Sequence, residues 1–511
     1  MQRRVDVVDG PLAFRMARYR AACANEVGLE IFTLPLLAAR LAGGFRRPAD
    51  RETLATAAAR ALEDGGFAQL DDVRGLPGMV RAALQTLERA WSADIDLDNA
   101  SFPSARVADI ALLERRIRDA LPHGAMLPRQ LRDAALERVC FAQTLFGSVR
   151  LEGIVDVEPL WRPLLVALAE QLDVSWSSAG EADRAWFPGR LTPAEPCPYG
   201  TARGELCADP RAEVVEAMRW VRELLSSGNV DARDVAITAA SPSAFDEHML
   251  VLSAEAGIPI HFSHGIPALS SWEGQSCAAL ADLLGHGLSQ ERFRRLIRHA
   301  SEGAKNSLPD DWATGLPPHA GLFTVEQWRR ALHSARNGRS EPDAAVQSLI
   351  PMLELLARGL PGAEEAGKTF LSGASLGLWK DALRNAPPAA VAMSLESLRI
   401  RDARDPANSV AWCPASHLVG APRRWTRLLG VAGRSWPRSE NEDPLLPDHV
   451  MSRRVLIPVP TAQRDRRAFE ILLQGQAEEI VLSRSQRSTE GALLCNSALW
   501  PFEEPHPVLR R

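Results

Sequence analysis

Short apolar runs alternate with segments of helical periodicity at the start of this chain, and this alternation restricts the fold more than any other feature. Residues 4–8 (RVDVV) and 29–33 (LEIFT) have the composition of buried strands, and helical spacing follows each of them, in LAFRMARYRAACANE and LPLLAARLAG. Strands that alternate with helices form parallel sheets, because each connection crosses one face of the sheet. We therefore expect an α/β fold.

The alternation returns twice more, and long helical stretches separate its occurrences. VRLEGIVD and VAITAA read as later strands, whereas ETLATAAARAL and VADIALLERRI repeat apolar residues every three or four positions. We expect two α/β cores, each interrupted by a helical insertion. The expected ranges are a first core at 1–45 and 146–178, its insertion at 46–145 with no convincing strand, a second core at 200–268 and 398–490, its insertion at 269–397, and a linker remnant at 491–511.

Composition limits the class of protein. Hydrophobic residues are 46% and charged residues 24% of the 511 residues, which are ordinary values for globular proteins. No apolar run reaches the roughly 18 residues that a membrane-spanning helix needs. The seven cysteines include no CxxC pair, and an odd number does not favour a disulfide framework. We expect a cytoplasmic protein with reduced thiols.

Charge is distributed unevenly along the chain. The net charge is -5, and 56 of the 59 basic residues are arginine. Residues 398–511 contain 17 arginines and 13 acids, a net of +4, so the preceding residues carry -9. A nucleic-acid surface is therefore expected in the C-terminal part.

One segment matches the phosphate-loop pattern GxxxxGK[ST], with Gly362, Gly367, Lys368 and Thr369 at the defining positions. A phosphate loop must follow a strand, so that backbone N–H groups and a helix N-terminus face the phosphates. The preceding SLIPMLELLARGL has helical spacing instead, and two glutamates within the loop would repel a triphosphate. This favours a connection between helices over a nucleotide site, which stays as the alternative.

The first strand-helix turn is where a phosphate loop would be expected, and it reads DGPLAFR at residues 9–15. It has one glycine, and residues 1–304 contain no lysine. Pro447 and Asp448 resemble the start of a PD-(D/E)xK nuclease site, but no acid-x-lysine follows to complete a Mg²⁺ site. His261 and His264 have no further metal ligand at suitable spacing. We expect neither a catalytic nor a metal site.

Arginines and tryptophans alternate around one strand in the C-terminal part. Arginine binds phosphates and tryptophan stacks on bases, which is the combination found in single-strand grooves. The alternative is that the tryptophans fill the core and the arginines are solvated. The candidate DNA contacts are Arg423, Arg424, Trp425, Arg427, Arg434, Trp436 and Arg438.

The sequence resembles the AddB-type subunit of bacterial double-strand-break resection complexes. The resemblance lies in VAWCPASHLVGAPRRWTRLLGVAGRSWPR, in RDRRAFEILLQGQAEEIVLSRSQRSTEGALLCNSALWP and in the N-terminal FTLPLLAARLAGG. It implies two RecA-like domains of the superfamily-1 helicase type, DNA as ligand (single strands or duplex ends) and an AddA-type helicase-nuclease subunit as partner.

The chain also departs from that family. ATP, Mg²⁺ and an iron-sulfur cluster belong to the family, but the residues that hold them have no match here. The segment from Arg464 to Gln476, where helicases place an ATP-sensing arginine, lacks the usual ending, and the family's PD-(D/E)xK nuclease would begin just past Pro501. We expect an inactive, DNA-binding helicase-like portion of a DNA-repair exonuclease. A P-loop NTPase and a protein-interaction scaffold that does not bind DNA are the alternatives.

Overall fold

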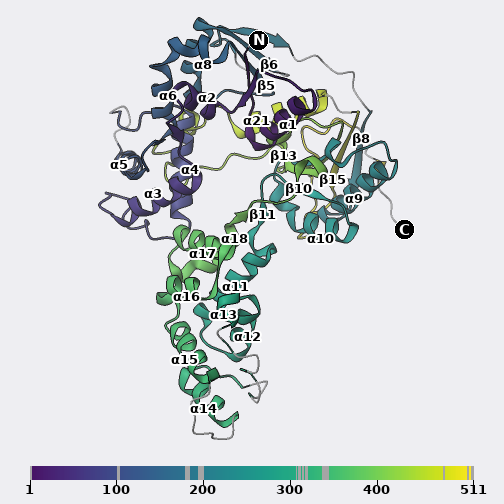
Figure 1. Cartoon of the computed structure of the whole chain (residues 1–511). Coiled ribbons are helices and arrows are strands. Elements are labelled where there is room, and N and C mark those ends of the chain that lie inside the picture. The colour runs from purple at the N-terminus through teal and green to yellow at the C-terminus, as the bar shows by residue number, and fades with distance from the viewer. Residues whose placement is uncertain are drawn as a thin grey trace. The chain divides into compact units, whose positions relative to one another are not determined.

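The computed structural model divides the chain into two compact units (Figure 1). Unit 1 contains Met1–Thr53, Gln85–Gly265 and Arg401–Arg511, and unit 2 contains Leu54–Leu84 and Ile266–Ile400. The structure describes residues 3–99, 104–178, 184–193, 201–306, 308, 312–313, 316, 320–335, 344–475, 478–502 and 506–507.

Unit 1 contains a first, five-stranded sheet in the order β2-β1-β5-β6-β7, in which all neighbouring strands are parallel. Its strands are β1 (Arg4–Val7), β2 (Leu29–Phe32), β5 (Ser148–Glu152), β6 (Asp173–Ser178) and β7 (Arg190–Pro193). Helices α1 (Gly10–Cys23), α2 (Leu34–Leu41) and α8 (Arg162–Gln171) connect them. Strand β7 pairs with β6, so the first core extends beyond residue 178, where the sequence predicted its end.

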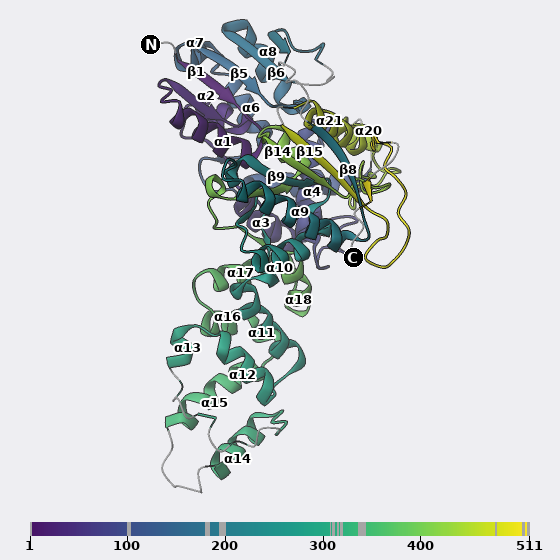
Figure 2. The ribbon, with the colours of Figure 1, turned by 90° about the vertical axis from the view of Figure 1, so that its right-hand side faces the viewer.

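A second, seven-stranded sheet in unit 1 has the order β10-β13-β9-β14-β15-β8-β16, again with parallel neighbours. Figure 2 shows β9, β14, β15 and β8 side by side. The strands are β8 (Thr201–Cys207), β9 (Val235–Ala239), β10 (Ile260–Phe262), β13 (Val410–Pro414), β14 (Trp425–Leu429), β15 (Glu479–Ser485) and β16 (His506–Pro507). The helices are α9 (Pro210–Ser226), α10 (Asp246–Ala256), α19 (Ala415–Val419), α20 (Arg453–Leu456) and α21 (Thr461–Gln474). The predicted parallel α/β fold is confirmed.

Helix α1 shares a hydrophobic core with the second sheet. Its residues Leu12, Ala13 and Met16 belong to the same buried cluster as Ala411 on β13 and Leu428 on β14. The two sheets are therefore joined through a buried apolar layer within one unit. The sequence predicted two cores, and it gave no sign that the first helix belongs to both.

The segment after the second core also packs on the sheet. An added Cβ on Gly204 of β8 would lie 2.5 Å from Phe502 and 2.7 Å from Trp500, so only glycine leaves room for these rings. Trp500 and Phe502, in the range 491–511 that was predicted as a linker remnant, thus pack on β8.

The helical stretch predicted at 46–145 is divided between the units. Its helices are α3 (Arg51–Glu63), α4 (Met79–Ser92), α5 (Ala105–Ala120), α6 (Pro128–Leu136) and α7 (Ala142–Phe146). Two short strands, β3 (Arg47–Pro48) and β4 (Ala125–Met126), pair in parallel, so the prediction of no strand there is wrong. Within unit 1, Asp443 anchors α4, since it accepts hydrogen bonds from Thr86 Oγ1 at 2.6 Å and Arg89 Nη1 at 2.9 Å.

Unit 2 is helical around its own core, which includes the buried rings of Phe293, Trp328, Phe370 and Trp379. Its helices from residue 266 on are α11 (Trp272–His286), α12 (Gln290–His299), α13 (Glu302–Asn306), α14 (Val325–Ala335), α15 (Ala344–Ala357), α16 (Ala363–Phe370), α17 (Gly373–Asn385) and α18 (Val391–Ser397). The antiparallel pair β11 (Ile266–Pro267) and β12 (Arg399–Ile400) lies where the chain enters and leaves this unit. The insertion predicted at 269–397 falls inside it.

Candidate functional site

The seven predicted DNA contacts occupy different environments, and three of them are buried. Arg427 and Trp436 have no exposed surface, and Arg423 is 6% exposed. The indole N–H of Trp436 donates to the carbonyl oxygen of Asp465 at 3.3 Å, and its ring packs edge-on against Phe469. Arg427 and Trp436 therefore present nothing to a nucleic acid in this structure, which corrects their predicted role.

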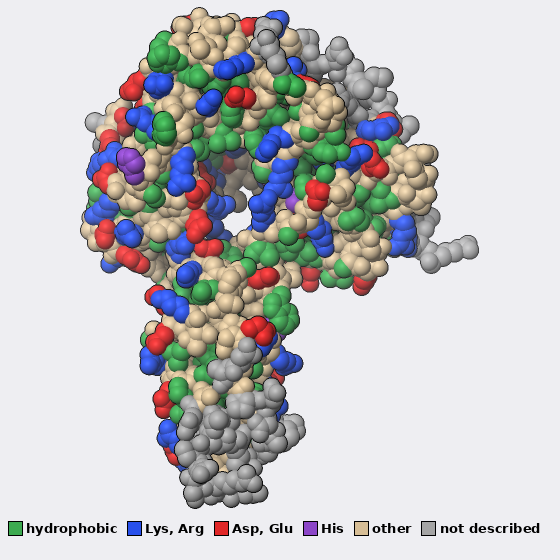
Figure 3. Space-filling view, viewed as in Figure 1, with side chains coloured by type: hydrophobic (Ala, Val, Ile, Leu, Met, Phe, Trp, Pro, Cys, Tyr) green, Lys and Arg blue, Asp and Glu red, His purple; other side chains and the backbone are tan. Residues whose placement is uncertain are grey.

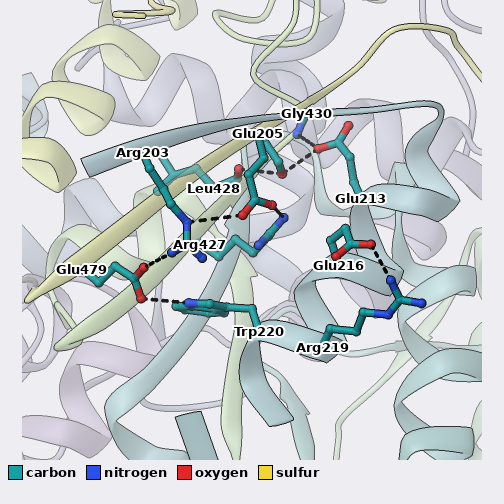
Figure 4. A network of polar contacts seen from close by, with 11 residues as sticks. Arg203, Glu205, Glu213, Glu216, Arg219, Trp220, Arg427, Leu428, Gly430 and Glu479 are labelled. Atoms are coloured by element: carbon teal, nitrogen blue, oxygen red, sulfur yellow. Dashed lines mark hydrogen bonds and ion pairs between the residues drawn. The ribbon is translucent and has the colours of Figure 1, made fainter. Parts of the chain in front are cut away.

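Arg427 serves the second sheet instead, as Figure 4 shows. Its Nη2 lies 2.5 Å from Oε2 of Glu205 on the edge-side strand β8. Arg203 bridges Glu205 at 3.3 Å and Glu479 at 2.8 Å, and Glu479 also accepts from the indole of Trp220 at 2.9 Å. Removing one partner of such a buried pair leaves an uncompensated charge, so these contacts hold β8, β14, β15 and α9 together.

Glu213 on α9 extends this network, and its side chain has no exposed surface. Its carboxyl group accepts hydrogen bonds from the backbone N–H of Gly430 at 2.9 Å, from Ser483 Oγ at 2.9 Å and from the hydroxyl of Ser485. Burial raises the pKa of Glu213, and these hydrogen bonds oppose that effect. A carboxyl group thus joins α9 to the ends of β14 and β15.

Arg423 is buried just before β14. Among the described residues, its Nε and Nη2 have no hydrogen-bond partner. Burial lowers the pKa of Arg423, and Cys413 opposes this effect. Arginine keeps its proton in such surroundings, so these N–H groups stay charged without being presented to solvent.

Two of the predicted contacts, Arg424 and Arg434, are exposed, and they lie on opposite sides of β14 in the chain. The guanidinium of Arg424 lies 4.6 Å from the ring centre of Trp425, and its Nε donates to Glu478 Oε1 at 2.8 Å. Arg434 follows the other end of the strand, with a left-handed φ of +68°. Nine residues separate them, and five of these form β14, which spans about 16 Å at 3.3 Å per residue, so the two arginines do not form one compact site.

Arg438 is partly exposed but already bound to an acid. Its Nε and Nη2 donate to the two carboxylate oxygens of Asp465 at 2.9 and 2.7 Å, and its backbone N–H donates to the same group at 2.8 Å. These hydrogen bonds raise the pKa of Arg438. The fork that would bind a phosphate is occupied by a carboxylate.

The phosphate-loop match is wrong in its structural context. It lies in a 3-10 turn and helix α16, and the element before it is helix α15 rather than a strand. Gly367 packs on Trp379, where an added Cβ would lie 2.2 Å from Cδ1. Lys368 pairs with Glu364 at 2.7 Å, and the hydroxyl of Thr369 donates to the carbonyl oxygen of Glu365 at 3.0 Å. No phosphate cradle exists in this segment.

The turn between β1 and α1 is filled by the chain itself. An added Cβ on Gly153 would lie 2.9 Å from the Cα of Gly420, at the end of α19. An added Cβ on Gly420 would lie 3.0 Å from Ala13 Cβ and 3.4 Å from the carbonyl oxygen of Asp9. The two sheets therefore meet backbone to backbone at the position where a phosphate loop would hold its ligand.

Charged groups close the same junction. Arg467 of α21 lies 2.5 Å from Oδ1 of Asp156, which follows β5. Glu158, two residues on, accepts from Ser92 Oγ at 2.9 Å, and burial raises its pKa, an effect that Arg464 opposes. The α21 segment in which a helicase would present an ATP-sensing arginine is thus engaged with carboxylates of the first sheet.

A basic cavity lies beside α1, at Arg15, Met16 and Tyr19. Its volume of about 610 Å³ is within the roughly 300–1,000 Å³ range of ligand sites. Arg15 and Tyr19 of α1 line it, together with Arg401 and Arg404 of the loop at 401–407. Figure 3 shows basic side chains next to one another on the face of unit 1 turned to the viewer. Within the described part of the chain, Arg15 and Arg401 form no ion pair with an acid.

The two acids of this cavity are engaged with their own surroundings. Asp402 is buried and accepts from the backbone N–H groups of Phe262 at 2.9 Å and Arg404 at 3.0 Å. Asp405 accepts from the backbone of Ala407 at 3.0 Å and from Asn408 Nδ2 at 2.9 Å. Nη1 of Arg404 donates to the carbonyl oxygen of Ile260 at 3.0 Å and lies 3.9 Å from Asp402. Arg15 and Arg401 are therefore the guanidinium groups that this cavity offers to a phosphate-bearing ligand.

The sequence interpretation missed this site. RIRDARDP, at residues 399–406, places three arginines in eight positions, but it was not considered as a candidate site. Arg15 lies almost 400 residues away and was not connected to it. The cavity exists because α1 packs on the second sheet, a tertiary contact that no local pattern indicates.

His261 and His264 make ordinary polar contacts. Nδ1 of His261 lies 3.7 Å from Asp402, and Nε2 of His264 lies 2.9 Å from Asp246. Burial lowers the pKa of His261, and Asp402 opposes this effect. Within the described ranges, no group of three or more His, Cys, Asp or Glu side chains has an arrangement that could hold a metal ion.

Comparison with known proteins adds no relative. No protein-family model matches the chain, and no curated protein matches it significantly. Among the helices of the described residues, none is long and apolar enough to span a bilayer.

Proposed function

We propose that this chain is a nucleic-acid-binding, non-hydrolysing helicase-like subunit of an AddB-type double-strand-break repair exonuclease. The arginine-lined cavity beside α1 carries the proposal, because Arg15, Arg401 and Arg404 converge there while Asp402 and Asp405 bind backbone groups. Among the described residues, Arg15 and Arg401 form no ion pair with an acid and Arg404 has only a long contact with Asp402, at 3.9 Å, so phosphodiester oxygens are favoured ligands. DNA, as single strands or duplex ends, is the proposed ligand, and an AddA-type helicase-nuclease the proposed partner.

Two further features support the helicase-like part. Both sheets are parallel and each is interrupted by helices, which is compatible with a pair of RecA-like domains. The β1–α1 turn contains no lysine and is packed against Gly420, which supports the absence of ATP hydrolysis. The protein would then need no ATP, Mg²⁺ or iron-sulfur cluster of its own, and the cytoplasm is its proposed location.

Equilibrium binding of a fluorescently labelled 30-nucleotide single strand tests the proposal. The triple variant Arg15→Ala/Arg401→Ala/Arg404→Ala should weaken binding at least tenfold at 100 mM salt, because each lost phosphate contact removes counterion release. A matched control removes three exposed arginines that lie on separate elements, Arg40, Arg190 and Arg219.

Each outcome has a definite meaning. The control should bind within about twofold of wild type, since scattered charges contribute little at this salt. A wild-type chain that binds no nucleic acid at 50 mM salt would refute the proposal. A protein-interaction scaffold would then be the better account.

A further inference from the structure

Helix α12 in unit 2 is strongly basic. Its sequence, QERFRRLIRH, contains four arginines and one acid. Arg298 lies four positions after Arg294 and three after Arg295, so these arginines share one side of the helix. Arg298 is exposed and has no ion pair with an acid among the residues that the structure describes.

An exposed indole lies beside this row. Trp272, the first residue of α11, is 61% exposed, although large aromatic side chains are normally covered. The imidazole of His299 at the end of α12 packs on it, with 4.4 Å between ring centres and 40° between planes. Burial lowers the pKa of His299, and Arg295 and Arg298 lower it further, so a neutral ring supports the indole.

Several acids lie near this surface, and two of them have basic partners. Asp282 lies 3.6 Å from Arg295 and also accepts from His286, and Glu302 binds Lys305 at 3.3 Å. The remaining acids are Glu273, which follows the indole in the chain, and Glu291 in the first turn of α12. Arg298 precedes His299, whose ring packs on the indole, and within the described residues it has no acidic partner.

We propose that Trp272 and the arginines of α12 form a stacking site for single-stranded nucleic acid. A base stacks on the open part of the indole, and Arg298 contacts an adjoining phosphate, the pairing of ring and cation that single-strand sites use. The site requires single strands, because the bases of a duplex already stack on each other. It rests on the proposed function for its ligand but uses residues of the other unit.

Binding of a 30-nucleotide single strand and of a duplex hairpin to the full chain tests this site. Trp272→Ala should weaken single-strand binding about 5- to 100-fold, whereas Trp272→Phe should retain most of it, since stacking is worth roughly 1–3 kcal/mol per base. Hairpin binding should change less than twofold. Arg298→Ala should lower the single-strand salt slope by about 0.7, the value for one phosphate.

Phe45→Ala is a matched control, since that ring is 95% exposed and lies in unit 1. It should leave both affinities unchanged. If wild type binds single strands and Trp272→Ala binds them equally well, the stacking site is wrong while the proposed function stands. Equal weakening of single strand and hairpin, or loss of self-association with unchanged DNA binding, also overturns it. A wild type that binds no nucleic acid overturns both.

Discussion

Arg467 Nη1 lies 2.5 Å from Asp156 Oδ1, and this ion pair joins helix α21 beside the second sheet to the end of strand β5 in the first. Both side chains are mostly buried, with 14% and 21% exposed. The pair lies next to the contact between Gly153 and Gly420, so charge and backbone packing close the same junction. A junction of this kind could open to admit a nucleotide between two domains. In this chain the ion pair and the backbone packing hold the two sides of the junction together.

Arg467→Ala should therefore destabilise unit 1. The lost pair leaves Asp156 without its cation in a partly buried position, which costs about 1–3 kcal/mol. Urea unfolding followed by tryptophan fluorescence measures this loss. Arg466→Ala is the control, because that neighbouring side chain is exposed and should change stability by less than about 0.5 kcal/mol. Equal effects of the two variants would contradict the assigned role of the pair.

Glu213 should make stability depend on pH. Burial raises its pKa in the folded chain, so its contribution is fully present below the unfolded value near 4.5 and is lost as pH rises through the folded value. Glu213→Gln keeps an acceptor for Gly430 without a titrating group. The difference in unfolding free energy between this variant and wild type should shift in the variant's favour from pH 4.5 to pH 8. A difference that is constant over this range would show that Glu213 does not titrate as described.

Substitutions of Gly367 and Lys368 should have effects opposite to those expected in a phosphate loop. Lys368→Ala should change neither stability nor any nucleotide affinity, because its ion pair with Glu364 is exposed. Gly367→Ala should destabilise unit 2, since its Cβ would overlap Trp379. Thermal unfolding and Mg-ATP titration of both variants check this. A micromolar affinity for Mg-ATP that Lys368→Ala abolishes would restore the rejected site.

Among the predicted DNA contacts, Trp436 lies in the core and Arg424 on the surface, so their alanine variants should differ in stability. Trp436→Ala should cost about 3–5 kcal/mol, because it removes a fully buried ring packed on Phe469. Arg424→Ala should be close to neutral, since its pair with Glu478 is half exposed. Urea unfolding compares them. A stable Trp436→Ala variant would mean that this ring is not part of the core.

Local patterns predicted the parts of the fold that local forces determine. The alternation of strands and helices was enough for parallel sheets, and the helical spacing before Gly362 was enough to doubt a phosphate loop. The same reasoning failed for Trp436 and Arg427, because composition around a strand does not say which side chains face a neighbouring helix. Arg427 looks like a DNA contact until Glu205, more than 200 residues earlier, is seen to bind it.

The cavity was beyond such reasoning for a related reason. Arg15 and Arg401 approach each other only because α1 contributes to the core of the second sheet. That packing depends on apolar side chains of two distant segments. Taken alone, the pattern around Arg15 also fits a solvent-exposed helix, and the pattern around Arg401 also fits a polar surface loop.

The salt dependence of single-strand binding tests the central claim most directly. Affinity should be measured from 50 to 300 mM salt for wild type, the Arg15/Arg401/Arg404 triple alanine variant and the Arg40/Arg190/Arg219 control. Each phosphate contact on a single strand contributes about 0.7 to the slope, so the cavity variant should lose about two units while the control keeps the wild-type slope. A folded cavity variant with the wild-type slope would contradict the assignment of this cavity to nucleic acid.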